Sequence, residues 1–136
     1  MKDDVVLNKI ATIERCIHRI QEEYLPAPSS FRTNYTIQDS IVLNLQRACE
    51  AVIDLANYII KKDKLGLPQS SRDAFDLLQA HHIIDEDLAL RMKRMVGFRN
   101  MAVHEYYSLN LDIIESIIKT SLNDFKNFTT KIIQQP

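Results

Sequence analysis

Apolar residues recur at helical spacing along almost the whole chain, and this repeat limits the fold more than any other feature. Between residues 6 and 24 they follow alternating steps of four and three, which places them on one face of a helix. Residues 36–64 carry two neighbouring apolar stripes, which is typical of a central helix packed on two sides. Strand signals are essentially absent. The sequence therefore predicts an all-α fold, a four- or five-helix up-and-down bundle.

Turn and capping signals divide this pattern into separate helices. Residues 25–30, Leu-Pro-Ala-Pro-Ser-Ser, end the first helix because proline cannot continue it. The second helix is predicted to run from about Thr36 to Lys64, and the third ends at Ala80. Polar residues that can cap the later helices stand just before each of them. They are Ser70 or Ser71, Asp85 and Asn110.

Composition indicates a single domain, residues 1–136, with 46% hydrophobic residues available for a core. The formal net charge of −1 means that any contact with nucleic acid must be local. Cys16 and Cys49 lie in helical patterns without CxxC spacing, and we interpret them as reduced and half-buried. The first residues lack a signal-peptide core, and no apolar run reaches the roughly 18 residues of a membrane span. We expect a cytoplasmic protein without a membrane partner.

An arginine interrupts the apolar stripe of the fourth predicted helix. At about 100° per residue, Arg99 falls on the side of Leu88, Met92 and Met95, which are expected to face the core. One interpretation is structural, with the stem covering apolar surface while the charged head reaches water. The other is that the guanidinium belongs to a functional site.

A polar ridge lies beside this stripe, formed by Lys93, Gly97, Asn100 and His104 at steps of four, three and four. Gly97 removes a side chain from the ridge and allows another backbone or a ligand to come close. Arg99 and His104 are about 140° apart around an ideal helix, so both can face one small atom only if the helix distorts or two copies converge. His104 could also have a structural role, as a hydrogen-bonded histidine near a helix end.

Residues 99–106, Arg-Asn-Met-Ala-Val-His-Glu-Tyr, resemble the R-x(4-6)-H signature of HEPN-domain ribonucleases, with Asn100 at the polar position after the arginine. Tyr106 makes the stretch similar to the R-x4-H-x-Y form of HepT toxins in HEPN–MNT toxin–antitoxin pairs. Residues 45–62 (LQRACEAVIDLANYIIKK) and 70–85 (SSRDAFDLLQAHHIID) also resemble HepT segments. The resemblance covers nearly the whole chain.

This resemblance implies an all-α homodimer with the motif in a cleft at the dimer interface, where two copies of Arg99 and His104 could converge. It also implies a metal-independent endoribonuclease toxin that acts on RNA, with no DNA partner and no cofactor. The expected partner is a cognate MNT nucleotidyltransferase antitoxin. That antitoxin is expected to transfer AMP from ATP to Tyr106, and Tyr107 is the natural control.

The candidate catalytic residues suit RNA cleavage, because the 2′-hydroxyl of RNA is an internal nucleophile beside the scissile phosphate. A histidine titrates near neutral pH, so His104 can take or donate the proton. Arg99 can hold the phosphate and stabilise the charge of the transition state. Asn100 can orient His104 or the phosphate. The products would end in a 2′,3′-cyclic phosphate or its hydrolysed form.

Other polar groups favour structural roles. His81 and His82 point in different directions if helical and complete no metal-ligand spacing, so we expect no metal site. Three carboxylates lie on or near one face of the second helix: Asp39, Glu50 and Asp54. We interpret them as a solvated surface or as partners of arginines. The alternative is a supporting role beside Arg99. Two other functions remain open at this point: a non-catalytic HEPN module that binds nucleotide or a partner protein, and a purely structural bundle.

Overall fold

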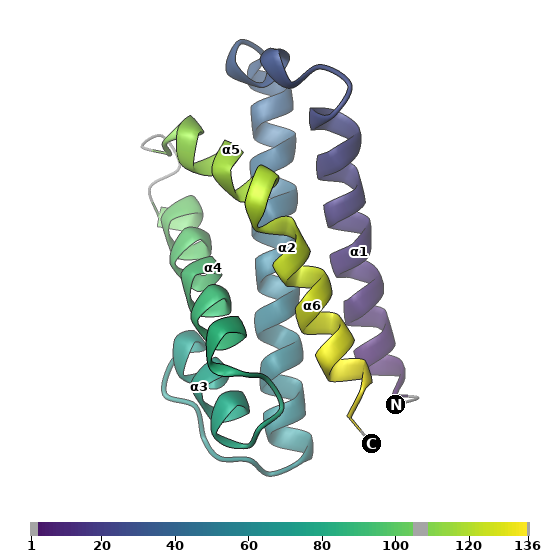
Figure 1. Ribbon diagram of the computed structural model, residues 1–136, viewed down its shortest axis with the longest axis vertical. Helices are drawn as coiled ribbons and strands as arrows, with labels where there is room; N and C mark the ends of the chain where they lie inside the picture. Colours follow the sequence, from purple (N-terminus) through teal and green to yellow (C-terminus); the bar gives the residue numbers. More distant parts are fainter. Residues whose placement is uncertain (1–2, 105–108, 136) are drawn as a thin grey trace.

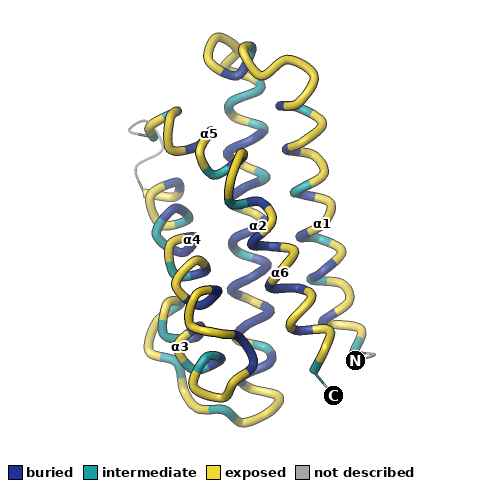
Figure 2. The backbone as a smooth tube through the Cα atoms, in the orientation of Figure 1, coloured by how far each residue is buried: buried dark blue, intermediate teal, exposed yellow. Residues whose placement is uncertain are grey.

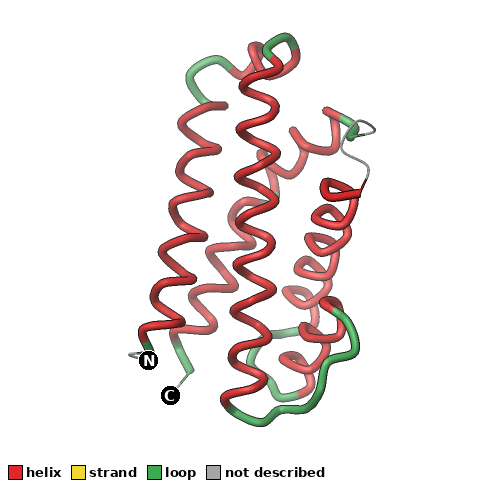
Figure 3. Tube along the Cα trace, turned by 180° about the vertical axis from the view of Figure 1, so that it is seen from behind, coloured by secondary structure: helices red, strands yellow, loops and turns green. Residues whose placement is uncertain are grey.

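The computed structural model describes residues 3–104 and 109–135, and within these ranges the chain forms the predicted all-α bundle (Figures 1 and 3). Two long helices, α1 and α2, pair antiparallel, α4 runs back beside α2, and α5 and α6 return toward the C-terminus. In chain order the elements are α1 (Asp4–Tyr24), the 3₁₀ helix η1 (Pro28–Arg32), α2 (Tyr35–Lys62), α3 (Ser71–Ala80), α4 (Glu86–His104), α5 (Leu111–Thr120) and α6 (Leu122–Ile133).

The predicted capping residues begin their helices as expected. Ser70, Asp85 and Asn110 each accept a hydrogen bond from a backbone N–H two or three residues further on, at 2.8 to 3.1 Å. Each cap satisfies a backbone donor that has no partner inside its helix. The sequence therefore located the starts of α3, α4 and α5, and it placed the ends of α2 within two residues.

The segment after Asn110 differs from the prediction, because it forms two helices instead of one. The break falls at Ser121, between α5 and α6. Thr120 donates its hydroxyl to the carbonyl oxygen of Ser116 at 2.6 Å, and such side-chain bonds to the preceding turn bend helices. With this break the described residues contain six α-helices, one more than the upper limit of the prediction.

The core surrounds α2, along which buried positions recur (Figure 2). At about 100° per residue, these buried positions cover more than half of the circumference of the helix. Helices α1, α3, α4 and α6 all pack against it. Cys16 and Cys49 are free thiols inside this core, and both are fully buried where the sequence suggested half-burial. No helix in the part of the chain that the structure describes is long and apolar enough to cross a bilayer.

A polar cluster fastens α5 to the end of α1 and to η1. Tyr24 donates its hydroxyl to Glu115 at 2.5 Å, and Arg32 donates its Nε to the other oxygen of Glu115 at 2.6 Å. Arg32 also pairs with Asp112. The hydrogen bond from Tyr24, followed by that from Arg32, lowers the pKa of Glu115. This cluster sets the direction of α5, which follows the end of α4.

We predict that Glu115→Gln lowers the melting temperature at neutral pH and that this loss shrinks in acid. A carboxylate with a lowered pKa in the folded state stabilises the protein above its unfolded pKa of 4.5, and the contribution disappears as pH falls through the folded value. Thermal melts from neutral pH to about pH 3 would measure the difference. Glu14→Gln, on an exposed position of α1, is the control. A difference that stays constant with pH would contradict the assignment.

Candidate functional site

Arg99 is half-buried on α4 and is held by two side-chain hydrogen bonds. Its Nε donates to Oδ1 of Asn100 at 3.0 Å, and its Nη2 donates to Oγ of Ser71 at 3.3 Å. These bonds use part of the guanidinium and leave further N–H groups for another acceptor. Among the described residues Arg99 has no carboxylate partner. The arginine is therefore anchored in direction while its charge remains available for an anion.

The charge of Arg99 also acts on the buried thiol of Cys49 on α2. Burial raises the pKa of Cys49 to about 12, although the charge of Arg99 acts in the opposite direction. A thiol with such a pKa is protonated at neutral pH and is a poor nucleophile. Cys49 is therefore packing beneath the site, and the chemistry must come from the polar ridge of α4.

Asn100 and His104 are both exposed on this ridge. Asn100 uses its amide oxygen to accept the hydrogen bond from Arg99, so its amide N–H groups point away from that contact and can donate to a ligand. His104 is the last described residue of α4 and has no hydrogen-bond or ion-pair partner in residues 3–104 and 109–135. The structure thus connects Arg99 with Asn100. Of the two roles expected for Asn100, orienting His104 or the phosphate, no contact with His104 occurs among the described residues.

Gly97 has a close neighbour, but it is a side chain of the same protein and not the other backbone or the ligand that the sequence suggested. A Cβ built on Gly97 would stand 2.8 Å from Nη2 of Arg72. Arg72 lies in the first turn of α3, next to the Ser71 that binds Arg99. The sequence did not indicate a role for Ser71 or Arg72 in this site. The isolated Gly97 indicated only a close approach to α4, and it could not identify the approaching residue.

The described contacts of the α2 carboxylates Glu50 and Asp54 are with structural partners and not with the motif. Asp54 pairs with Lys9 at 3.2 Å, and Glu50 accepts a hydrogen bond from Gln46 at 3.1 Å. Asp39 instead lines a groove between α2 and α5. The two hydrogen bonds of Arg99 go to none of the three.

The two adjacent histidines lie outside this site. Nε2 of His81 lies 3.0 Å from the carbonyl oxygen of Leu65, and His82 adopts a left-handed backbone with φ of 61°. No group of three potential metal ligands occurs in the described ranges. Tyr106 and Tyr107 fall within residues 105–108, outside the described residues, so their predicted roles stay predictions.

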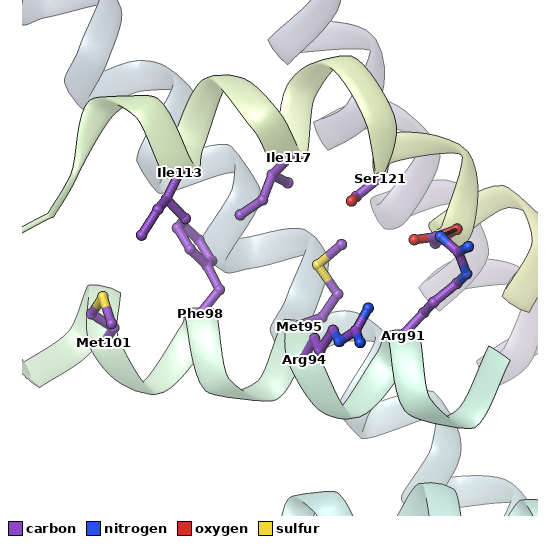
Figure 4. Close-up of a pocket in the computed structure, with 9 residues that line it drawn as sticks. Arg91, Arg94, Met95, Phe98, Met101, Ile113, Ile117 and Ser121 are labelled. Atoms are coloured by element: carbon purple, nitrogen blue, oxygen red, sulfur yellow. Dashed lines mark ion pairs between the residues drawn. The ribbon is translucent and has the colours of Figure 1, made fainter. Parts of the chain in front are cut away.

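An apolar cavity of about 250 Å³ opens on the other side of α4, between this helix and α5 and α6 (Figure 4). Figure 4 shows Phe98 and Ile113 pointing toward each other across it. Phe98 and Asn100 are two residues apart and so point to nearly opposite sides of the helix. Arg91 pairs with Asp124 at the edge of this cavity at 3.5 Å. The cavity is therefore separate from the polar ridge.

Comparisons with known proteins agree with the family resemblance of the sequence. The family model described as Ribonuclease HepT-like matches residues 13–132. The mRNA nuclease HepT of Shewanella oneidensis is 52% identical over 126 residues, which cover 93% of this chain and 94% of the relative. The tRNA nuclease HepT of Aphanizomenon flos-aquae is 28% identical over 88 residues, which cover 65% of this chain and 60% of the relative.

The fold also has a close counterpart among solved structures. A tri-AMPylated Shewanella oneidensis HEPN toxin, solved in complex with an MNT antitoxin, superimposes with a TM-score of 0.93 at 50% identity. The match covers 98% of this chain and 99% of that chain. The helical arrangement that carries Arg99, Asn100 and His104 is thus one that a toxin of this kind adopts in a complex with its antitoxin.

Proposed function

The chain belongs to the HepT-like ribonuclease family and is the ribonuclease toxin of a HEPN–MNT toxin–antitoxin pair, and we propose that Arg99, Asn100 and His104 form its active site. The observation that carries this proposal is the anchored guanidinium of Arg99, which has hydrogen bonds to Asn100 and Ser71 and no carboxylate partner in the described chain. An unneutralised, oriented guanidinium suits a phosphate.

The proposed reaction is the attack of the 2′-oxygen of RNA on the adjacent phosphorus. The 2′-hydroxyl gives its proton to a base, the bond from phosphorus to the 5′-oxygen breaks, and the leaving oxygen receives a proton. His104 is the residue of the ridge that can transfer protons at neutral pH. Arg99 and the amide N–H of Asn100 donate to the phosphate oxygens as their negative charge increases. The first product is a 2′,3′-cyclic phosphate.

We predict that Arg99→Ala and His104→Ala each abolish growth inhibition and lower RNA cleavage by about 10²–10⁴-fold, because each removes a charge-stabilising or proton-transferring group. The assay is purified protein on mRNA and on tRNA, with and without EDTA. Arg94→Ala is the control, since this arginine lies on the cavity side of α4. Helical circular dichroism and melting should persist in all variants. Full cleavage by either active-site variant, or unfolding of Arg99→Ala, would refute the assignment.

We further propose a homodimer in which two copies of α4 contribute to one cleft. Arg99 and His104 of one helix diverge by about 140°, and a second copy of α4 would let the two groups converge on one phosphate without distortion of the helix. The last turns of α4 also expose apolar surface that a partner could cover, with Met101 38% and Val103 48% exposed. A twofold axis near these turns would bring Arg99 of one copy toward His104 of the other.

The dimer predicts that two inactive variants complement each other. In a mixture of Arg99→Ala and His104→Ala, a mixed dimer retains one intact pair, so roughly a quarter of the wild-type activity should return. Each variant alone is the control. Sedimentation velocity at micromolar concentration would show the oligomeric state. A fully active monomer would rule out the shared cleft. A dimer without complementation would mean that Arg99 and His104 of each active site come from the same copy.

The antitoxin is proposed to silence the toxin by transferring AMP to Tyr106. The Shewanella oneidensis toxin carries AMP in its complex with an MNT antitoxin, which supports the same chemistry here. The tyrosine oxygen attacks the α-phosphorus of ATP and pyrophosphate leaves. The new phosphodiester brings negative charge two residues from His104, where the free N–H groups of Arg99 could bind it in place of RNA.

We predict that the antitoxin and ATP add AMP to Tyr106 and abolish cleavage, whereas Tyr106→Phe stays unmodified and active. Intact mass would count the added groups, and peptide mapping would locate them. Tyr107→Phe is the matched control and should still be modified and silenced. If wild-type toxin is neutralised without a mass increase, inhibition results from binding alone, and AMP on Tyr107 would move the site by one residue.

A further inference from the structure

The side chain of Arg72 lies across the catalytic helix at the only position of the polar ridge that lacks a side chain. Its Nη2 would be 2.8 Å from a Cβ on Gly97, closer than such atoms approach in proteins. We propose that Arg72 binds the RNA phosphate next to the scissile one and thereby holds the strand along α4. This inference rests on the proposed function, because it assigns a second part of the substrate to the same ridge.

The charge of Arg72 is not used inside the described protein. It forms no ion pair or hydrogen bond with any residue in 3–104 or 109–135, whereas Lys93 on the same ridge pairs with Asp76 at 2.8 Å. Arg72 also stands in the first turn of α3, where the helix dipole disfavours a positive charge. An unpaired cation at an unfavourable position is better explained by a bound anion than by fold stability.

The position of Arg72 along α4 fits a neighbouring phosphate. Gly97 precedes Asn100 by three residues and His104 by seven, which correspond to rises of about 4.5 and 10.5 Å along the helix. Arg99 and Asn100 form one group of donors, and Arg72 adds a second cation about one turn earlier on the same ridge. Two separated cations on one ridge suit two successive phosphates of a chain better than a single small anion.

Ser71 connects the two arginines. It accepts a hydrogen bond from Arg99 at 3.3 Å and is followed directly by Arg72 at the start of α3. The cap of that helix, in which Ser70 accepts from the backbone N–H of Asp73 at 3.1 Å, fixes where α3 begins and so places the backbone of both residues. The short helix α3 therefore presents one residue that positions the catalytic arginine and one that reaches over Gly97 toward the substrate.

The proposal is tested by the salt dependence of RNA binding in the cleavage-deficient His104→Ala protein. Loss of a contact with one phosphate of single-stranded RNA makes the plot of the logarithm of the binding constant against the logarithm of the salt concentration shallower, by about 0.7 in slope. Fluorescence anisotropy with a labelled single-stranded RNA should show this decrease for Arg72→Gln. Arg72→Lys should retain most of the slope, since the charge remains. Arg15→Gln, at an exposed position of α1, removes the same charge elsewhere and should leave the slope unchanged.

A second variant reaches the same contact from α4. Gly97→Ala places a methyl group where the guanidinium lies, so Arg72 must move away, and its flexible side chain allows this without unfolding. Gly97→Ala should weaken RNA binding, and it should cause no further loss when combined with Arg72→Gln, because the contact is already absent. Melting temperatures should not fall, since alanine favours a helix more than glycine does.

Kinetics in the protein with an intact His104 separate substrate binding from a structural effect. Arg72→Gln should raise KM for RNA with little change in kcat, and the pH profile of kcat should stay the same. If the wild-type protein binds and cleaves RNA but Arg72→Gln leaves the salt slope of the His104→Ala protein unchanged, only the inference about Arg72 is overturned. If the wild-type protein neither cleaves nor binds RNA, the proposed function falls and this subsite falls with it.

Discussion

The burial of α2 is the constraint on which the rest of the molecule depends. Apolar side chains cover more than half of this helix, and an isolated helix of that kind would be insoluble, so four other helices pack around it. The arrangement places α4 along one side of α2, with Cys49 beneath the guanidinium of Arg99. The polar residues of α4 lie on its outer side, while its buried residues, such as Met92 and Val96, pack into the shared core.

Helix α4 has three different surfaces, and each has a separate task. Leu88, Met92 and Met95 face the core and hold the helix in place. The side that carries Phe98 borders an apolar cavity, which leaves α4 and α5 incompletely packed against each other. The third surface is the polar ridge, where a glycine lets a side chain from α3 approach. Because the surfaces are distinct, substitutions at exposed positions of the ridge, such as Asn100 and His104, disturb little of the packing.

Local signals in the sequence account for most of the fold, whereas the completed site depends on contacts between distant residues. Periodicity and caps located the helices, since both are read from neighbours a few positions apart. The helix break at Ser121 was not predicted, because the apolar repeat does not indicate the hydrogen bond from the hydroxyl of Thr120 to the carbonyl oxygen of Ser116. The motif residues were visible as a pattern, but the contacts of Arg99 with Ser71 and of Gly97 with Arg72 join positions 28 and 25 residues apart in the chain. No periodicity encodes such pairs.

The packing of α6 has a consequence for the order in which the bundle is completed during synthesis. Phe128 of α6 lies edge-on to Phe75 of α3, with ring centroids 5.7 Å apart, and Asp124 of α6 contacts Arg91 of α4. The ribosome makes α4 before α6, so a nascent chain that already contains Arg99 and His104 still lacks the helix that closes the core behind them. Domains fold as units, so α4 is secured in the bundle only after α6 has been made. A chain without α6 therefore carries α4 without the contacts from α6 that hold it in the folded bundle.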